Sequence, residues 1–358
     1  MTTFHRLASS VCLFCLKVIG YISNTMPLPK SGSIPSPCWA VRYMLQKAFG
    51  NDKLSKLEFL TQFYHNDGLF CLDNKIYIFD QKLAQAAINK LEKGAEHYLN
   101  DSPLKDTFLG SSQKSPETRR AVASLFRKTS IEERASWIFE DTKRICSKIR
   151  LKSLKSAKDN MKLFLMAGTE TTASSIPVIF SLLNDFPDIQ QELRDEVENR
   201  WTEILTEPTT SLPKIESMMK EVLRLYPIAP FISRQNNVPV NLGNIYLDQH
   251  SDVIIFTWGI HRSPYHWKDS KVFKPFRFLG MESLQSNMYI PFGAGSRVCI
   301  GQHLAWIELR LVIANLLHEF RFSKNPATSD LKFVVDWVHA VVHPDKDMIF
   351  SLENVEHD

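Results

Sequence analysis

Apolar residues recur at helical spacing along much of this chain. The longest helix is predicted over residues 158–184, an apolar stretch with Ala-Gly-Thr-Glu-Thr-Thr at its centre and Pro177, which should kink it, further on. Two shorter helices are predicted over residues 188–205 and 213–226. A final amphipathic helix is expected over residues 304–317.

Apolar runs bounded by turn residues predict strands in two places. Residues 69–72 and 75–79 flank an Asp-Asn pair and are typical of a hairpin with a two-residue turn. Residues 238–256 contain further short β-rich runs, whereas residues 83–91 and 117–150 have helical spacing. The predicted fold class is therefore mainly α with small β-sheets.

The N-terminal region differs from the rest. Residues 7–22 are mostly apolar, but Lys17 interrupts them and they fall short of the ~20 apolar residues that span a bilayer. A degraded anchor, a signal-like segment and a surface helix all remain open. Prolines follow as a stiff connector. We predict an N-terminal segment with its connector over residues 1–37 and a single domain over residues 38–358.

Composition narrows the class of function. The 43 basic and 39 acidic side chains give a net charge of +4, and no basic run is interleaved with aromatic residues. We therefore expect no nucleic-acid partner, while a basic patch for an acidic protein remains open. The six cysteines are scattered, which favours a reducing, intracellular compartment over a disulfide framework. The lone C-x-x-C near the N-terminus lacks the second pair that a zinc site needs.

The strongest chemical signal surrounds Cys299. Phe292, Gly295, Arg297, Cys299 and Gly301 stand in the order F-x-x-G-x-R-x-C-x-G. Glycines permit tight turns, and backbone N–H groups at the start of the following helix stabilise a thiolate. Arg297 can pair with a propionate. A cysteine alone would be interpreted as a buried structural residue, but five fixed positions in ten residues indicate a ligand.

Two weaker signals precede the cysteine. Glu221 and Arg224 lie three residues apart on one helix face, a spacing that by itself indicates a solvated ion pair. Gly168 in mid-helix costs about 1 kcal/mol against Ala and therefore needs a reason. Beside it, the acid Glu170 and the hydroxyl of Thr171 offer a proton relay. The alternative is a polar solvent face, but the apolar flanks predict that this helix is buried.

Together these stretches resemble the cytochrome P450 family. The cysteine segment is similar to the family's haem-binding signature, which implies that Cys299 is the thiolate ligand of the iron of haem b. The resemblance places Phe292, Gly295, Arg297 and Gly301 in the same haem-binding loop. A cysteine ligand of this kind favours O–O cleavage.

The resemblance implies roles for residues outside the loop. Glu221 and Arg224 look like the family's E-x-x-R, with Arg277 as the expected third member, and this set would support the haem pocket structurally. Arg234 stands where many members place a propionate-binding arginine. Residues 261–267 resemble the family's H-R-x-P-x-x-W segment.

The central segment of the long helix is similar to the family's oxygen-activation motif. On that resemblance, Glu170 and Thr171 deliver protons to dioxygen at the iron. Ala167 and Gly168 are expected beside the haem, with Gly168 leaving room for the ligand above the iron.

The chain departs from the family pattern before this helix. Arg120 and Ala167 are only 47 positions apart, an interval in which family members place several helices that include the roof of the substrate pocket. The fold is therefore expected to be incomplete there, and a missing roof admits water to the distal side. The family's usual Trp-x-x-x-Arg is not found around Arg119 and Arg120, so the motif gives no support for a propionate role of either arginine.

The resulting hypothesis is a haem-dependent monooxygenase that inserts one oxygen atom of O₂ into an apolar organic substrate. A reductase or ferredoxin would supply the electrons. The alternative is a truncated, non-catalytic haem-binding remnant or splice variant of such an enzyme, whereas a generic helical interaction protein would need every motif to be coincidental. The expected location is intracellular, either membrane-associated through residues 7–22 or cytoplasmic.

Overall fold

The computed structural model describes seven stretches of the chain: residues 34–37, 39–91, 154–281, 288–324, 333–336, 341–345 and 348–356. The expectations for residues 7–22, for the helix over residues 117–150 and for Arg119 and Arg120 lie outside these stretches. In the described part, no helix is both long enough and apolar enough to cross a membrane.

The chain forms two compact units, and each of them is assembled from separate parts of the sequence. Unit one consists of Met1–Gly94, Pro230–Ser270 and Gln285–Ile290. Unit two consists of Ala95–Ala229, Lys271–Leu284 and Pro291–Asp358. The single domain over residues 38–358 stays a prediction.

Unit one contains the predicted hairpin. Strands β1 (Leu69–Leu72) and β2 (Lys75–Ile78) pair in antiparallel register. The turn residues Asp73 and Asn74 have φ of 50° and 61°, the left-handed values that a two-residue type I′ turn requires. Asp and Asn tolerate this conformation better than other non-glycine residues, which is why the pair marks the turn.

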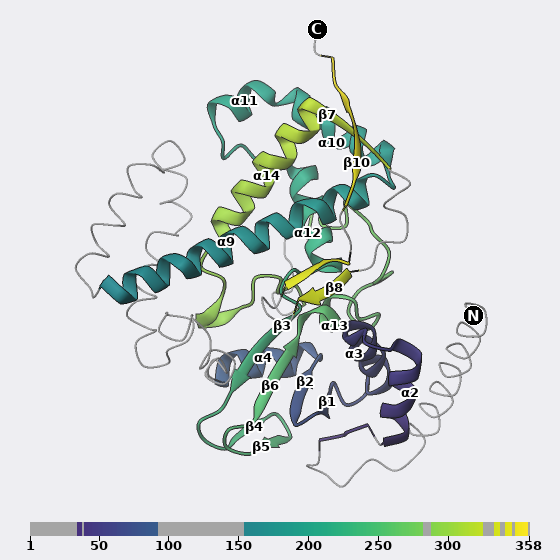
Figure 1. The fold of residues 1–358 in the computed structure, drawn as a ribbon, viewed down its shortest axis with the longest axis vertical. Helices are drawn as coiled ribbons and strands as arrows, with labels where there is room; N and C mark the ends of the chain where they lie inside the picture. The colour runs from purple at the N-terminus through teal and green to yellow at the C-terminus, as the bar shows by residue number, and fades with distance from the viewer. Residues whose placement is uncertain are drawn as a thin grey trace. The chain divides into compact units, whose positions relative to one another are not determined.

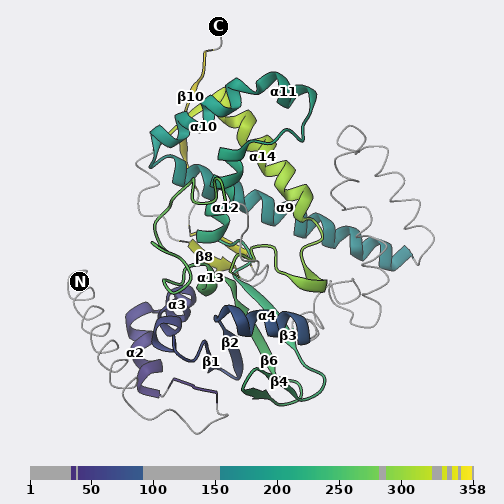
Figure 2. The ribbon, with the colours of Figure 1, turned by 180° about the vertical axis from the view of Figure 1, so that it is seen from behind.

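The hairpin belongs to a four-stranded sheet in the order β1-β2-β6-β3. Strand β6 (Asp252–Phe256) runs parallel to β2 and antiparallel to β3 (Phe231–Gln235). The predicted β-rich stretch also contains a separate hairpin of β4 (Val240–Leu242) and β5 (Ile245–Leu247). Figure 2 shows this sheet from behind, with one helix packed against β6.

That helix is α4 (Gln81–Lys90), which confirms the helix predicted over residues 83–91 and begins two residues earlier. Asp80 caps it by accepting hydrogen bonds from the backbone N–H groups of Lys82 and Leu83. Unit one also contains helices that the sequence analysis did not identify: α2 (Trp39–Phe49), α3 (Lys53–Phe63) and the short α13 (Thr257–His261).

Unit two is a bundle of helices around one apolar core. The long α9 (Leu154–Leu183) confirms the longest predicted helix and runs through Pro177 without dividing. Helices α12 (Pro213–Leu225) and α14 (Gln302–Glu319) lie across it (Figure 1). The apolar core between these helices includes Val178, Ile179, Phe180, Leu183, Met218, Met219, Val222, Leu309, Ile313 and Leu317.

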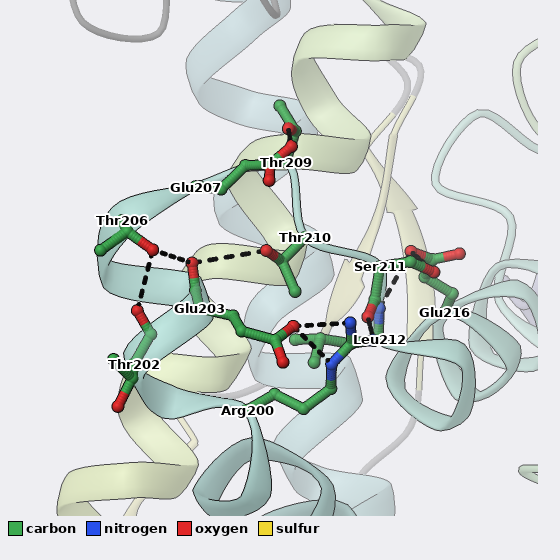
Figure 3. A network of polar contacts seen from close by, with 10 residues as sticks. All are labelled: Arg200, Thr202, Glu203, Thr206, Glu207, Thr209, Thr210, Ser211, Leu212 and Glu216. Atoms are coloured by element: carbon green, nitrogen blue, oxygen red, sulfur yellow. Dashed lines mark hydrogen bonds and ion pairs between the residues drawn. The ribbon is translucent and has the colours of Figure 1, made fainter.

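The helix predicted over residues 188–205 is wrong in one respect, because it is two helices. Helix α10 (Pro187–Asn199) ends at Arg200, and α11 (Trp201–Thr206) starts directly after it. The Arg200 guanidinium binds Glu203 at 2.7 Å and also donates to the Ser211 carbonyl, as part of the polar network shown in Figure 3. Arg200 makes these contacts at the junction of the two helices. A local pattern of apolar residues does not contain this contact.

Short strand pairs complete unit two. Strand β7 (Phe320–Lys324) pairs with β10 (Phe350–Asn354), and β8 (Phe333–Asp336) pairs with β9 (Val341–Pro344). These strands did not stand out in the sequence. The described architecture is helix-rich with small sheets, which confirms the predicted fold class.

Candidate functional site

Cys299 lies at the end of a tightly turned loop that leads into α14. Gly293 and Gly295 have φ of 74° and 69°, a region that side chains with a Cβ rarely adopt. The loop then passes through a single 3-10 turn, and the Cys299 N–H donates to the Phe292 carbonyl at 2.8 Å. The Cys299 side chain is exposed and not in a disulfide. The loop thus presents a thiol at its surface, next to the start of a helix.

An aromatic pair connects the cysteine loop to a buried apolar cluster. The rings of Phe292 and Trp306 of α14 lie 5.6 Å apart between centroids, and both pack against the buried cluster of Leu223, Ile228 and Val341. The carbonyl that accepts the Cys299 N–H therefore belongs to a residue whose ring is held by the core.

The three predicted support residues meet in the structure. The Glu221 carboxylate accepts hydrogen bonds from Arg224 Nε at 2.7 Å and from Arg277 Nε at 2.9 Å. It also accepts the backbone N–H of Lys274 at 3.0 Å. The side chains of Glu221 and Arg224 are 0% exposed, so the pair is buried and is not the solvated pair that the spacing by itself indicates. Leu223, which lies between Glu221 and Arg224 in the sequence of α12, belongs to the buried cluster against which Phe292 packs.

Helix α9 carries the four residues expected beside the haem. Ala167, Gly168 and Glu170 are exposed, and Thr171 is half-buried with its hydroxyl donating to the Ala167 carbonyl at 2.7 Å. A Cβ built on Gly168 would meet no atom within 4 Å, so this face of the helix borders open space. The prediction that the helix is buried holds only beyond Ser175, where its side chains enter the core.

One acid that did not stand out in the sequence is shielded from water. Glu308 of α14 is half-buried, and α14 packs against α9. Burial raises the pKa of Glu308, and Thr172 opposes this shift. The position of Glu308 nine residues after Cys299 carries no signal by itself, because burial depends on how the helices pack.

Two further predicted features lie in unit one. Arg234 is 3% exposed on β3, and its guanidinium donates to the Ser233 carbonyl at 2.9 Å. In the H-R-x-P-x-x-W segment, His261 is fully buried and its Nε2 accepts the Ile290 N–H at 2.8 Å, while Trp267 is also buried. The propionate role of Arg234 stays a prediction.

The sequence matches one protein family over most of its length. The family described as Cytochrome P450 matches residues 96–350. Among the relatives, human cytochrome P450 4Z1 is 29% identical over 290 residues, which is 78% of this chain and 52% of the relative. Rabbit (Oryctolagus cuniculus) cytochrome P450 3A6 is 34% identical over 165 residues, which is 45% of this chain and 33% of the relative.

The fold has counterparts among solved structures. The crystal structure of the cytochrome P450DA heme domain aligns with a TM-score of 0.72 at 16% identity and covers 90% of this chain and 97% of its own. Fold and cysteine loop together define the class of haem-thiolate proteins. The chain belongs to the cytochrome P450 family. It spans between a third and about half of the length of the two curated relatives named above.

The residues of unit two fit the haem b of this family. An accessible thiol at a helix start is a suitable axial ligand, because nearby N–H groups and the helix dipole favour its thiolate form. The half-buried Arg297 offers a cation two residues before it. On α9, the space at Gly168 is open where a side chain would otherwise stand. These residues would hold the group through Cys299 and Arg297.

Proposed function

We propose that this chain is a haem-dependent monooxygenase acting on an apolar organic substrate. In the net reaction, one atom of O₂ enters a C–H bond of the substrate. The other atom leaves as water, with two electrons from a reductase or ferredoxin and two protons from solvent. Bound haem with a thiolate ligand supplies the O–O cleavage. The observation that carries the proposal is the accessible Cys299 on a glycine-turned loop before α14.

Each residue of the site has a task in this proposal. Cys299 binds the iron, and Arg297 pairs with a propionate. The Phe292 carbonyl accepts the Cys299 N–H, which fixes the backbone that carries the thiol. Glu221 binds Arg224 and Arg277 and thereby ties α12 to the segment that follows residue 271. This keeps α12 in place beside the buried cluster against which Phe292 packs.

The residues of α9 handle protons in this proposal. The Thr171 hydroxyl already donates to the Ala167 carbonyl, which fixes its oxygen as an acceptor on the helix surface. The exposed Glu170 exchanges protons with water and passes them to that oxygen. Gly168 keeps the adjacent space free for dioxygen and substrate.

The test is the absorption spectrum of the haem-reconstituted protein after reduction and exposure to carbon monoxide. We expect a strongly red-shifted Soret band that is lost in Cys299→Ala. The matched control is Cys71→Ala, a half-buried cysteine of unit one whose substitution leaves the band unchanged. Absence of haem uptake, or a band typical of a neutral or histidine ligand, would refute the proposal and favour a non-catalytic remnant.

A further inference from the structure

We propose that His261 is a positioning residue for the haem ligand and that it acts through a hydrogen bond to the backbone just before the cysteine loop, residues 292–301. The inference rests on the proposed haem-binding function and deepens it, because it gives a task to a histidine that the proposed function does not use. Two observations carry it: the buried contact between His261 and the Ile290 N–H, and the short path along the chain from Ile290 to Cys299.

The contact between His261 and Ile290 is buried and has one possible direction. Both residues are shielded from water, and the Ile290 N–H lies 2.8 Å from Nε2 of His261. A backbone N–H can only donate, so this ring nitrogen accepts the hydrogen bond and carries no proton itself. A buried backbone N–H without an acceptor costs its full desolvation penalty. His261 therefore supplies an acceptor that an apolar side chain at this position could not supply.

The imidazole of His261 is held in a fixed orientation. Its ring stacks on the ring of Tyr289, with centroids 5.5 Å apart and 19° between the planes. His261 is the last residue of α13, which packs against α3. The Glu58 carboxylate of α3 accepts the Trp258 Nε1–H at 3.0 Å and forms an ion pair with Arg262 at 3.5 Å. Residues on both sides of His261 are thus tied to α3, so a rigid support presents the acceptor nitrogen.

Ile290 leads directly into the cysteine loop. Pro291 follows it, and a proline ring fixes its own φ and restricts the residue before it to extended conformations. Phe292 comes next, and its carbonyl accepts the Cys299 N–H at 2.8 Å. One stiff residue therefore separates the amide that His261 holds from the residue that fixes the backbone of Cys299.

The loop needs this support because glycines make its other side flexible. Gly293 and Gly295 follow Phe292 with φ of 74° and 69°. Glycine reaches such values readily, and it leaves them as readily. The packed ring of Phe292 fixes a side chain, whereas the hydrogen bond to Ile290 fixes the backbone on the side that has no glycine. Without that bond, the loop should exchange between conformations that present the Cys299 thiol and conformations that do not.

Hydrogen exchange of the full chain tests the contact independently of haem. In the wild type, the amides of Ile290 and Cys299 should exchange slowly. In His261→Phe, which keeps an aromatic ring beside Tyr289 and removes the acceptor, both should exchange at least about tenfold faster, the effect of losing one hydrogen bond of ordinary strength. His261→Gln, whose side-chain oxygen can reach the place of Nε2, should restore most of the protection. A fast Ile290 amide in the wild type, or unchanged protection in His261→Phe, overturns the inference.

The carbon monoxide spectrum tests whether the contact positions the ligand. At equal haem content, the ratio of the red-shifted Soret band to the band typical of a neutral ligand should fall about tenfold in His261→Phe and recover in His261→Gln. The matched control is His65→Phe. His65 also stacks on an aromatic ring, that of Tyr265 at 5.0 Å, and its Nδ1 contacts the Gln62 carbonyl at 3.1 Å. His65 lies outside the segment that leads to Cys299, so its replacement should leave the ratio unchanged.

The possible results separate positioning of the ligand from packing alone. A His261→Phe variant that takes up less haem but keeps the wild-type ratio shows a packing role and refutes the inference, as does an equal fall of the ratio in His65→Phe. If His261→Phe does not fold, His261→Gln decides, because a wild-type ratio in it supports the inference and a low ratio contradicts it. A wild-type chain that takes up no haem refutes the proposed function, and the exchange rates then decide the inference by the criteria above.

Discussion

The buried carboxylate of Glu221 allows a quantitative test of how much its ion pairs with Arg224 and Arg277 contribute to the free energy of unfolding. In Glu221→Gln the side chain keeps its shape but loses its charge, while Arg224 remains 0% exposed. The guanidinium of Arg224 then keeps its desolvation cost without the carboxylate that offsets it. The ion pair between Glu221 and Arg277, which is 9% exposed, is lost as well.

The expected loss follows from this burial. Removing one partner of a fully buried ion pair costs about 3–5 kcal/mol, a large part of the ~5–15 kcal/mol that stabilises a domain. Arg277→Gln should cost less, because Glu221 would still be paired with Arg224 at 2.7 Å. The surface pair of Lys214 and Glu192, with side chains 34% and 42% exposed, should contribute under about 1 kcal/mol.

Urea unfolding measures these differences. The free energy of unfolding would be obtained for Glu221→Gln, Arg277→Gln and the matched control Glu192→Gln, with circular dichroism and tryptophan fluorescence recorded together to check that the transitions coincide. The expected order of destabilisation is Glu221→Gln, then Arg277→Gln, then Glu192→Gln. A loss for Glu221→Gln as small as that for Glu192→Gln would refute the reasoning that the buried charge governs this cluster.

Three other perturbations have directions that the structure determines. Gly168→Ala should raise the melting temperature by the equivalent of up to about 1 kcal/mol, because the position is helical and open. Gly68→Ala should lower the melting temperature, because φ is +70° and the new Cβ would lie 2.5 Å from Asp80 Cβ. Equal effects of the two substitutions would contradict both assignments. Asn74→Val should cost about 1–2 kcal/mol in thermal unfolding, since a β-branched residue is disfavoured at φ of 61°, and a neutral result would argue against the type I′ turn. Burial raises the pKa of Glu308, so the folded chain holds this proton more tightly than the unfolded chain and stability falls as pH rises from the ordinary carboxyl range through the folded pKa. Glu308→Gln should lose less stability over that window, and denaturant midpoints that vary with pH identically in both proteins would refute this.

Local sequence determined much of the chain's secondary structure. The hairpin at Asp73-Asn74, the helix capped by Asp80 and the long α9 all follow from interactions within a few residues of one another. The turns at Gly293 and Gly295 before Cys299 likewise use a backbone conformation that glycine itself adopts readily. Such features can be predicted because their energies are local.

Other elements were not evident because their apolar patterns are weak or short. Helix α3 packs against α13, and strands β7 and β9 pack against α9, which are segments distant from them in sequence. At the break between α10 and α11, Arg200 donates a hydrogen bond to the Ser211 carbonyl, eleven residues away. Neither the period of apolar residues nor a capping signal contains that information.

The site divides in the same way between local and tertiary causes. Sequence alone identified Cys299 and its loop, and resemblance to a family indicated that Glu221 would meet Arg277. Tertiary structure decided that the Glu221 carboxylate is fully buried, that Ala167 to Glu170 face outward, and that burial raises the pKa of Glu308. Burial and contact between helices depend on how distant segments pack, because a side chain's solvation is set by all the atoms around it rather than by its neighbours along the chain.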